Sequence, residues 1–127
     1  METAIKWLLR IAGIYGVIVL APFYFLERRF GVEQPPEVTH PEFFYGFTGV
    51  ALAWQLAFLI MSGHPARFHP LLPACVVEKF SFGIAAVVLF SQGRLAKQML
   101  AGGLVDLVFG ALFLTAFLVW KPAQSVP

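Results

Sequence analysis

The sequence predicts an all-α membrane protein, an up-down bundle of four transmembrane helices. The first observation is composition, because 59% of the residues are hydrophobic and only 13% are charged, whereas a soluble domain carries about 25% charged residues. The second is that four segments reach the ~20 mostly apolar residues needed to cross a bilayer. A chain of 127 residues suits one domain. We therefore expect a single integral membrane domain, residues 1–127, whose first partner is the lipid bilayer.

The four predicted spans are separated by segments rich in proline, glycine and charge. They are residues 5–26, 43–63, 71–93 and 98–120. We expect the first span to be retained, because Pro22 directly follows its only small-residue cleavage site. Pro22 should also bend the end of that span mildly. The stretch "ERRFGVEQPPEVTHPE" between the first two spans predicts a loop.

Short connections make consecutive helices antiparallel neighbours and place both chain termini on one side of the membrane. Trp7 and Trp120 then mark one interface, and Phe43, Phe44 and Tyr45 mark the other. Basic residues are slightly more numerous on the side of the termini. Because positive charge favours the cytoplasmic side, we expect both termini to be cytoplasmic.

Arg10, Gln55 and Glu78 are the first candidate polar cluster inside the membrane. With a rise of about 1.5 Å per residue, three helices bring them to a similar depth, roughly 7–10 Å from the side of the termini. A guanidinium near a carboxylate favours the charged carboxylate, so Arg10 is the expected partner of Glu78. Lys79 is rotated by about 100° from Glu78 and should extend toward the headgroups. The cluster locks helices together, forms a polar pocket, or consists of side chains that reach the interface independently.

Asp106 is a second candidate, and it lies roughly 20 Å from the side of the termini. Gly103, Asp106 and Gly110 share one helix face, which should pack closely against a neighbouring helix. We expect no cation at the depth of Asp106 and therefore a neutral carboxyl group. Its expected role is a hydrogen bond to Thr48 or Tyr15, and its alternative role is proton handling or ligand binding.

Trp54 lies in the middle of the second span rather than at an interface. It either packs in the core or forms the wall of a pocket for a flat hydrophobic ligand. The glycine pairs Gly13/Gly16 and Gly46/Gly49 are expected to let helices approach closely.

Other site types find little support in the sequence. The stretch "HPARFHP" places His64 and His69 upstream of Cys75 and Glu78, but the histidine spacing matches no standard ligand motif, so no metal is predicted. The absence of a basic run argues against nucleic-acid binding. No cofactor is predicted, although a quinone or a lipid fits a hydrophobic pocket.

The layout of spans and loops resembles the small bacterial four-helix membrane families around DoxX. The resemblance rests on the last helix, "GGLVDLVFGALFLTAF", together with "FYGFTGVALAWQLAFLI" and "RFHPLLPACVVEKFSFG". It implies a protein of the bacterial cytoplasmic (inner) membrane, with some relatives associated with quinone-linked sulfur oxidation or redox-stress complexes. No catalytic residue carries over from the resemblance.

The leading functional hypothesis is a non-enzymatic membrane protein that binds a hydrophobic small molecule or serves as a membrane partner subunit. The alternative is a small membrane enzyme or proton-coupled carrier that uses Glu78 and Asp106. Their depth difference of roughly 10 Å argues against a single shared site. Four helices without an internal repeat do not supply alternating access alone, although a homo-oligomer would remove that objection.

Overall fold

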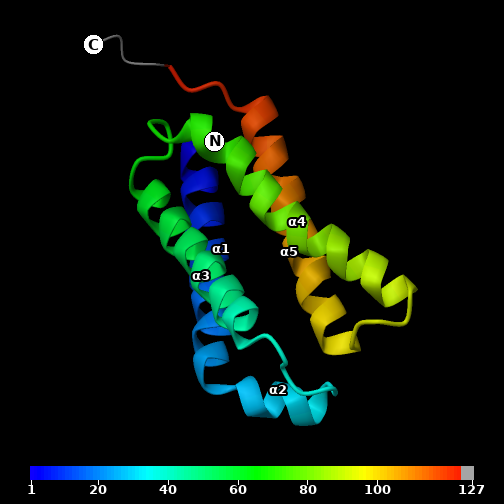
Figure 1. Ribbon diagram of the computed structural model, residues 1–127. Coiled ribbons are helices and arrows are strands. Elements are labelled where there is room, and N and C mark those ends of the chain that lie inside the picture. The colour runs from blue at the N-terminus through cyan, green and yellow to red at the C-terminus, as the bar shows by residue number, and fades with distance from the viewer. Residues whose placement is uncertain (124–127) are drawn as a thin grey trace.

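The structure is a computed structural model that describes residues 1–123, and these residues form helices and turns with no strand (Figure 1). In chain order the elements are α1 (Glu2–Leu20), η1 (Ala21–Phe25), α2 (Glu27–Glu33), α3 (Pro41–Gly63), η2 (His69–Leu71), α4 (Leu72–Ser91) and α5 (Lys97–Val119), where η denotes a short 3₁₀ helix. Four helices, two of them lengthened by their adjoining 3₁₀ turns, are long and apolar enough to cross a membrane.

The boundaries of the last three predicted spans agree with α3, α4 and α5 to within about two residues. The first span differs, because its α-helical part ends at Leu20 and continues as the 3₁₀ helix η1. Pro22 lies in this turn and has no N–H to donate to the α-helical ladder. The helix therefore changes type at the proline where a mild bend is predicted.

The prediction of a plain loop between the first two spans is wrong, because this segment contains the short helix α2. Within α2, Arg29 Nε donates a hydrogen bond of 2.7 Å to Glu33 Oε1, four residues later. Phe30 contacts Phe23 and Phe44 edge-on, with ring centroids 5.0 and 5.4 Å apart. Hydropathy did not indicate these contacts, since they depend on aromatic residues brought together from different elements.

The long helices are arranged as two antiparallel pairs, α1 with α3 and α4 with α5 (Figure 1). The pairs meet at the end where α1 begins and α5 ends, and they diverge toward α2 and the α4–α5 connection. The up-down order of the chain is as expected. The arrangement differs from a closed bundle, because the pairs touch each other over only part of their length.

The shared hydrophobic core explains this shape. Its buried members all belong to the half of the molecule in which the pairs meet: Ile5, Leu9 and Ala12 of α1, Phe58 and Met61 of α3, Leu72, Cys75 and Val76 of α4, and Phe113 and Ala116 of α5. Burial of their apolar surface holds the pairs together there. The other half lacks such a common core, and there the two helix pairs separate.

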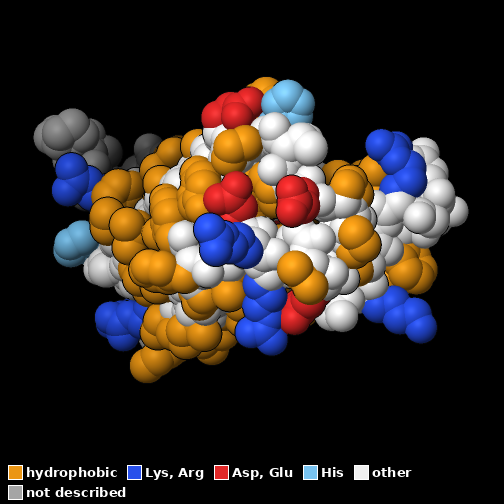
Figure 2. Space-filling view, turned by 60° about the horizontal axis from the view of Figure 1, so that its bottom comes forward, with side chains coloured by type: hydrophobic (Ala, Val, Ile, Leu, Met, Phe, Trp, Pro, Cys, Tyr) orange, Lys and Arg blue, Asp and Glu red, His pale blue; other side chains and the backbone are white. Residues whose placement is uncertain are grey.

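The outward faces of the long helices are strongly apolar. Large exposed side chains include Ile14 and Ile18 of α1, Ile60 of α3, Ile84 of α4 and Val108 of α5. Figure 2 turns the α2 end of the molecule toward the reader and shows charged side chains gathered there among hydrophobic ones. Apolar flanks and a charged end match the surface that a lipid bilayer and its aqueous boundary require.

Candidate functional site

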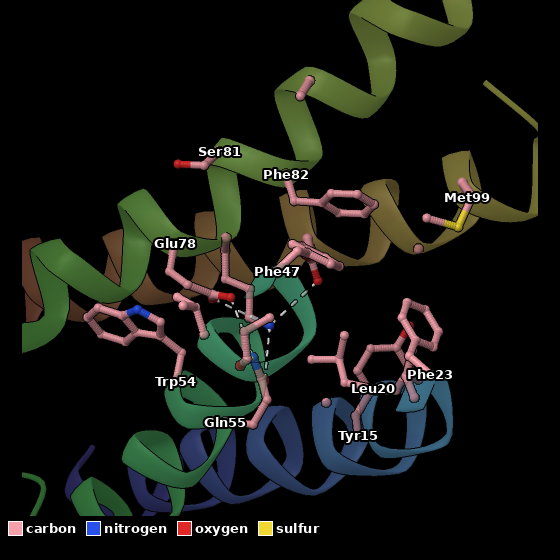
Figure 3. A pocket seen from close by; sticks show the side chains of 18 of the residues that line it. Tyr15, Leu20, Phe23, Phe47, Trp54, Gln55, Glu78, Ser81, Phe82 and Met99 are labelled. Atoms are coloured by element: carbon pink, nitrogen blue, oxygen red, sulfur yellow. Dashed lines mark hydrogen bonds and ion pairs between the residues drawn. The ribbon is translucent and has the colours of Figure 1, made fainter. Parts of the chain in front are cut away.

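A cavity of about 1180 Å³ lies between the two helix pairs, in the half of the molecule where they diverge. Most of its wall is apolar, and aromatic side chains contribute much of it (Figure 3). These aromatic residues include Tyr15, Phe23, Phe47, Trp54 and Phe82. Phe47 of α3 and Phe82 of α4 approach each other with ring centroids 6.0 Å apart, so the two pairs touch across the cavity at this point.

The floor of the cavity carries a charged cluster centred on Lys79. The residue is only 2% exposed. Its Nζ donates a hydrogen bond of 3.3 Å to Gln55 Oε1 and lies 3.5 Å from Asp106 Oδ1 and 3.7 Å from Glu78 Oε2. One ammonium group from α4 therefore joins side chains of α3, α4 and α5.

Two aromatic rings complete the surroundings of the Lys79 ammonium. Nζ lies 5.2 Å from the ring centroid of Phe58 and 5.6 Å from that of Phe109, within the ~6 Å of a cation–π contact. Phe58 belongs to the shared core. The cluster thus lies at the boundary between the closed half of the protein and the cavity.

Gln55 connects the helix pairs at this boundary. Its Nε2 donates to Ala51 O in its own helix at 2.8 Å and to Glu78 Oε1 at 3.4 Å, and its Oε1 accepts from Lys79. Gly16 of α1 lies directly behind the carboxamide, and a Cβ at that position would overlap it. A glycine at position 16 is therefore needed to accommodate Gln55.

The local sequence of α4 explains why Lys79 points inward. It shares the buried face of α4 with Cys75, Val76 and Gly83, at the spacing of three to four residues that places side chains on one face. On α5, a Cβ at Gly110 would lie 3.3 Å from Lys79 Cβ and 2.5 Å from Phe80 Cε1. Gly110 therefore leaves room for the base of the lysine side chain.

Two predictions about the first cluster are corrected by this geometry. Gln55 and Glu78 are together as expected, but Arg10 forms no ion pair within residues 1–123, and its guanidinium lies 5.2 Å from the ring centroid of Trp7. Lys79, expected to extend toward the headgroups, is the actual cation of the cluster. The physical reason is that Lys79 finds two carboxylates and two aromatic faces within reach, which compensate its desolvation.

The second predicted site is also arranged differently. Asp106 does have a cation at its level, because Lys79 reaches it. Thr48 is buried and donates its hydroxyl to Phe44 O in its own helix at 2.8 Å. Tyr15 lines the same cavity as Asp106, and its ring packs against Phe109 at 5.8 Å. The expected close packing of the glycine face of α5 is found, since Gly103 lies against Ala86.

The two carboxylates belong to one site, contrary to the expectation from residue counting. Glu78 and Asp106 both line the cavity, with side chains 14% and 16% exposed, and both contact Lys79. Counting residues along the helices predicted separate sites for the two carboxylates. It did not account for the divergence of the helix pairs or for the length of the lysine side chain. Trp54 also lies on the cavity wall (Figure 3).

The sequence contained one indication that Lys79 points inward, which an estimate of its depth in the membrane does not reveal. A lysine that shares a helix face with a cysteine, a valine and a glycine points toward neighbouring helices rather than toward headgroups. Nothing comparable indicated the Phe47–Phe82 contact, because it depends on the angle between the helix pairs.

Within the described part of the chain, no group of three or more His, Cys, Asp and Glu side chains could hold a metal ion. Comparison of the chain with protein-family models, curated proteins and solved structures finds no match. The resemblance to the DoxX families therefore stays a prediction.

Proposed function

We propose that this chain is an integral membrane protein that binds a hydrophobic small molecule in the cavity between its helix pairs. The observation that carries the proposal is the cavity itself, about 1180 Å³, which compares with the ~300–1,000 Å³ of common ligand pockets. Apolar walls with a few convergent polar groups are typical of such pockets. Here the polar groups are the Lys79 cluster at the floor.

The surface supports the membrane part of the proposal. Soluble proteins rarely expose large continuous apolar areas, yet the outward faces of all four long helices do so. We propose a location in the bacterial cytoplasmic membrane with both termini in the cytoplasm. In the membrane, a cavity between diverging helices is accessible to molecules that dissolve in the lipid.

Native mass spectrometry of the protein purified in mild detergent tests the binding function. We expect a co-purifying lipid, quinone or other hydrophobic molecule at defined stoichiometry. The Gly46→Leu variant should reduce its occupancy, because position 46 lines the cavity and a Cβ there meets no atom within 4 Å, so the new side chain occupies the space of the ligand.

Gly63→Leu is the matched control. Gly63 ends the same helix, its Cβ would also meet no atom within 4 Å, and it does not line the cavity. Equal occupancy in both variants would contradict binding in the cavity. A stoichiometric protein subunit in place of a small molecule would favour the role of a partner subunit.

A small membrane enzyme or proton-coupled carrier is the alternative function. It is favoured by one observation, that Glu78 and Asp106 share a cavity and contact the same ammonium. Paired carboxylates next to a lysine are suited to proton transfer. Proteoliposomes with an internal pH dye would show ligand-driven proton movement that Asp106→Asn abolishes if this alternative is correct.

A further inference from the structure

The floor of the cavity carries more negative than positive charge. Glu78 and Asp106 each lie within ion-pair distance of Lys79, and in the described residues no other cation lies within that distance of either carboxylate. Ionised, the three groups sum to one excess negative charge. An uncompensated charge in an apolar surrounding is costly, so the floor favours an additional positive charge or proton.

The floor also offers acceptors rather than donors. Glu78 Oε2 is buried without a hydrogen-bond partner, because its 3.7 Å separation from Lys79 Nζ exceeds hydrogen-bond length. The Lys79 ammonium is already engaged by Gln55 and by the faces of Phe58 and Phe109. A ligand that reaches the floor therefore gains most by donating hydrogen bonds to carboxylate oxygens.

We infer that the molecule bound in this cavity is a cationic amphiphile, with an amine head at the Glu78–Asp106 carboxylates and an apolar chain or ring system along the aromatic walls. The inference rests on the proposed binding function and names the chemical class of the ligand. A protonated amine supplies the missing charge and the missing N–H donors together. Trp54 also lines the cavity, and an indole ring attracts a cation that approaches its face.

The same geometry disfavours two other classes of hydrophobic ligand. A quinone presents carbonyl oxygens, which are acceptors and would face carboxylates that need donors. A fatty acid or an anionic lipid headgroup would add negative charge where negative charge is already in excess. An alkyl alcohol is the neutral reference, because it has the same chain and one donor but no charge.

Three probes of equal chain length test the inference: dodecylamine, dodecanol and dodecanoate. Their dissociation constants are measured by thermal stabilisation of the full-length protein in nanodiscs of neutral phosphatidylcholine at neutral pH, where the amine is protonated. We expect dodecylamine to bind at least about tenfold more tightly than dodecanol, the usual effect of one charge-assisted hydrogen bond. Dodecanoate should bind most weakly.

Glu78→Gln and Asp106→Asn each reduce the floor to one carboxylate and one ammonium, without a large change of shape. Either variant should weaken dodecylamine binding by at least about tenfold and so lose the preference for the amine over dodecanol. Two variants are used so that a folding failure of one leaves the other informative. Glu2→Gln makes the same chemical change at an exposed position outside the cavity and should leave all three affinities unchanged.

The outcomes separate the inference from the proposed function. Equal binding of all three probes, or an amine preference that persists in both carboxylate variants, contradicts the cationic head and leaves hydrophobic binding intact. No binding of any probe, as when a lipid acyl chain or a second copy of the protein fills the cavity, contradicts both proposals.

Discussion

Lys79 illustrates how a charged residue is accommodated in an apolar interior. Burial removes the hydration of its ammonium group. Contacts with a carboxamide oxygen, two carboxylates and two aromatic rings compensate for this loss. Removal of one member of a buried ion pair is usually more damaging than replacement of the whole pair, because the remaining charge is left uncompensated. The cluster should therefore depend on its cation more than on either carboxylate alone.

Lys79→Met should destabilise the protein by about 3–5 kcal/mol, because two carboxylates would remain at the floor without a counter-charge. The loss is measured from unfolding in mixed detergent micelles, followed by circular dichroism. Arg10→Met is the control. Arg10 has no carboxylate partner within residues 1–123, and its loss should cost about 1 kcal/mol or less, the scale of its contact with Trp7.

A double-mutant cycle tests the same coupling more directly. In an Asp106→Asn background, Lys79→Met should lower the free energy of unfolding clearly less than it does in the natural chain. The reason is that only one carboxylate, rather than two, then remains without a counter-charge. Additive losses would show that Lys79 and Asp106 do not interact in the folded protein.

At the scale of elements, glycine decides where helices approach and where they do not. The close approach expected at Gly13 and Gly16 is present, because a Cβ at Gly13 would come within 2.8 Å of Leu59 and one at Gly16 would overlap Gln55. The corresponding expectation for Gly46 is wrong, since Gly46 faces the cavity with no atom within 4 Å of its Cβ position. A spacing of small residues does not reveal whether a partner helix is opposite.

The two glycines give opposite predictions for the same substitution. Gly16→Ala should destabilise the protein by about 1–3 kcal/mol, since the new methyl group displaces the Gln55 carboxamide. Gly46→Ala should be neutral or stabilise by up to about 1 kcal/mol, because alanine favours the helix and nothing opposes it. Detergent unfolding of both variants provides the comparison, and equal losses would contradict the placement of α1 against Gln55.

The elements themselves were largely predictable, and the exception has a specific cause. Long apolar segments bounded by proline and glycine allowed α3, α4 and α5 to be located to within about two residues. The first span, predicted as residues 5–26, is instead α1 followed by the 3₁₀ helix η1. Helix α2 was missed because its stability comes from one ion pair and from the packing of Phe30 on Phe23 and Phe44. These contacts join three elements that the sequence alone does not place next to one another.

At the scale of the whole molecule, α1 begins and α5 ends at the same end (Figure 1), and α2 lies at the other. Membrane orientation therefore reduces to which end faces the cytoplasm. The slight excess of basic residues near the termini favours the cytoplasm for that end. Variants with one introduced cysteine can decide the orientation. The natural Cys75 can stay in place, because it is fully buried and should not react.

We expect Glu37→Cys to react with a membrane-impermeant maleimide in intact cells, and Glu2→Cys to react only after the cells are lysed. Both positions are exposed and lie at opposite ends of the molecule. The unmodified chain, with Cys75 alone, is the control for background reaction. Labelling of Glu2→Cys in intact cells, with protection of Glu37→Cys, would reverse the orientation.

The sequence by itself determined the class of the protein, the position of its long helices and the choice of Gln55, Glu78 and Asp106 as residues of interest. These follow from local properties, namely the hydropathy of a segment and the cost of a polar side chain within it. Only the tertiary structure decided that Lys79 rather than Arg10 is the cation, that Glu78 and Asp106 share one site, and that the helix pairs diverge around a cavity. Those outcomes depend on the angle between the helix pairs and on the reach of one side chain, which arise from contacts between distant segments.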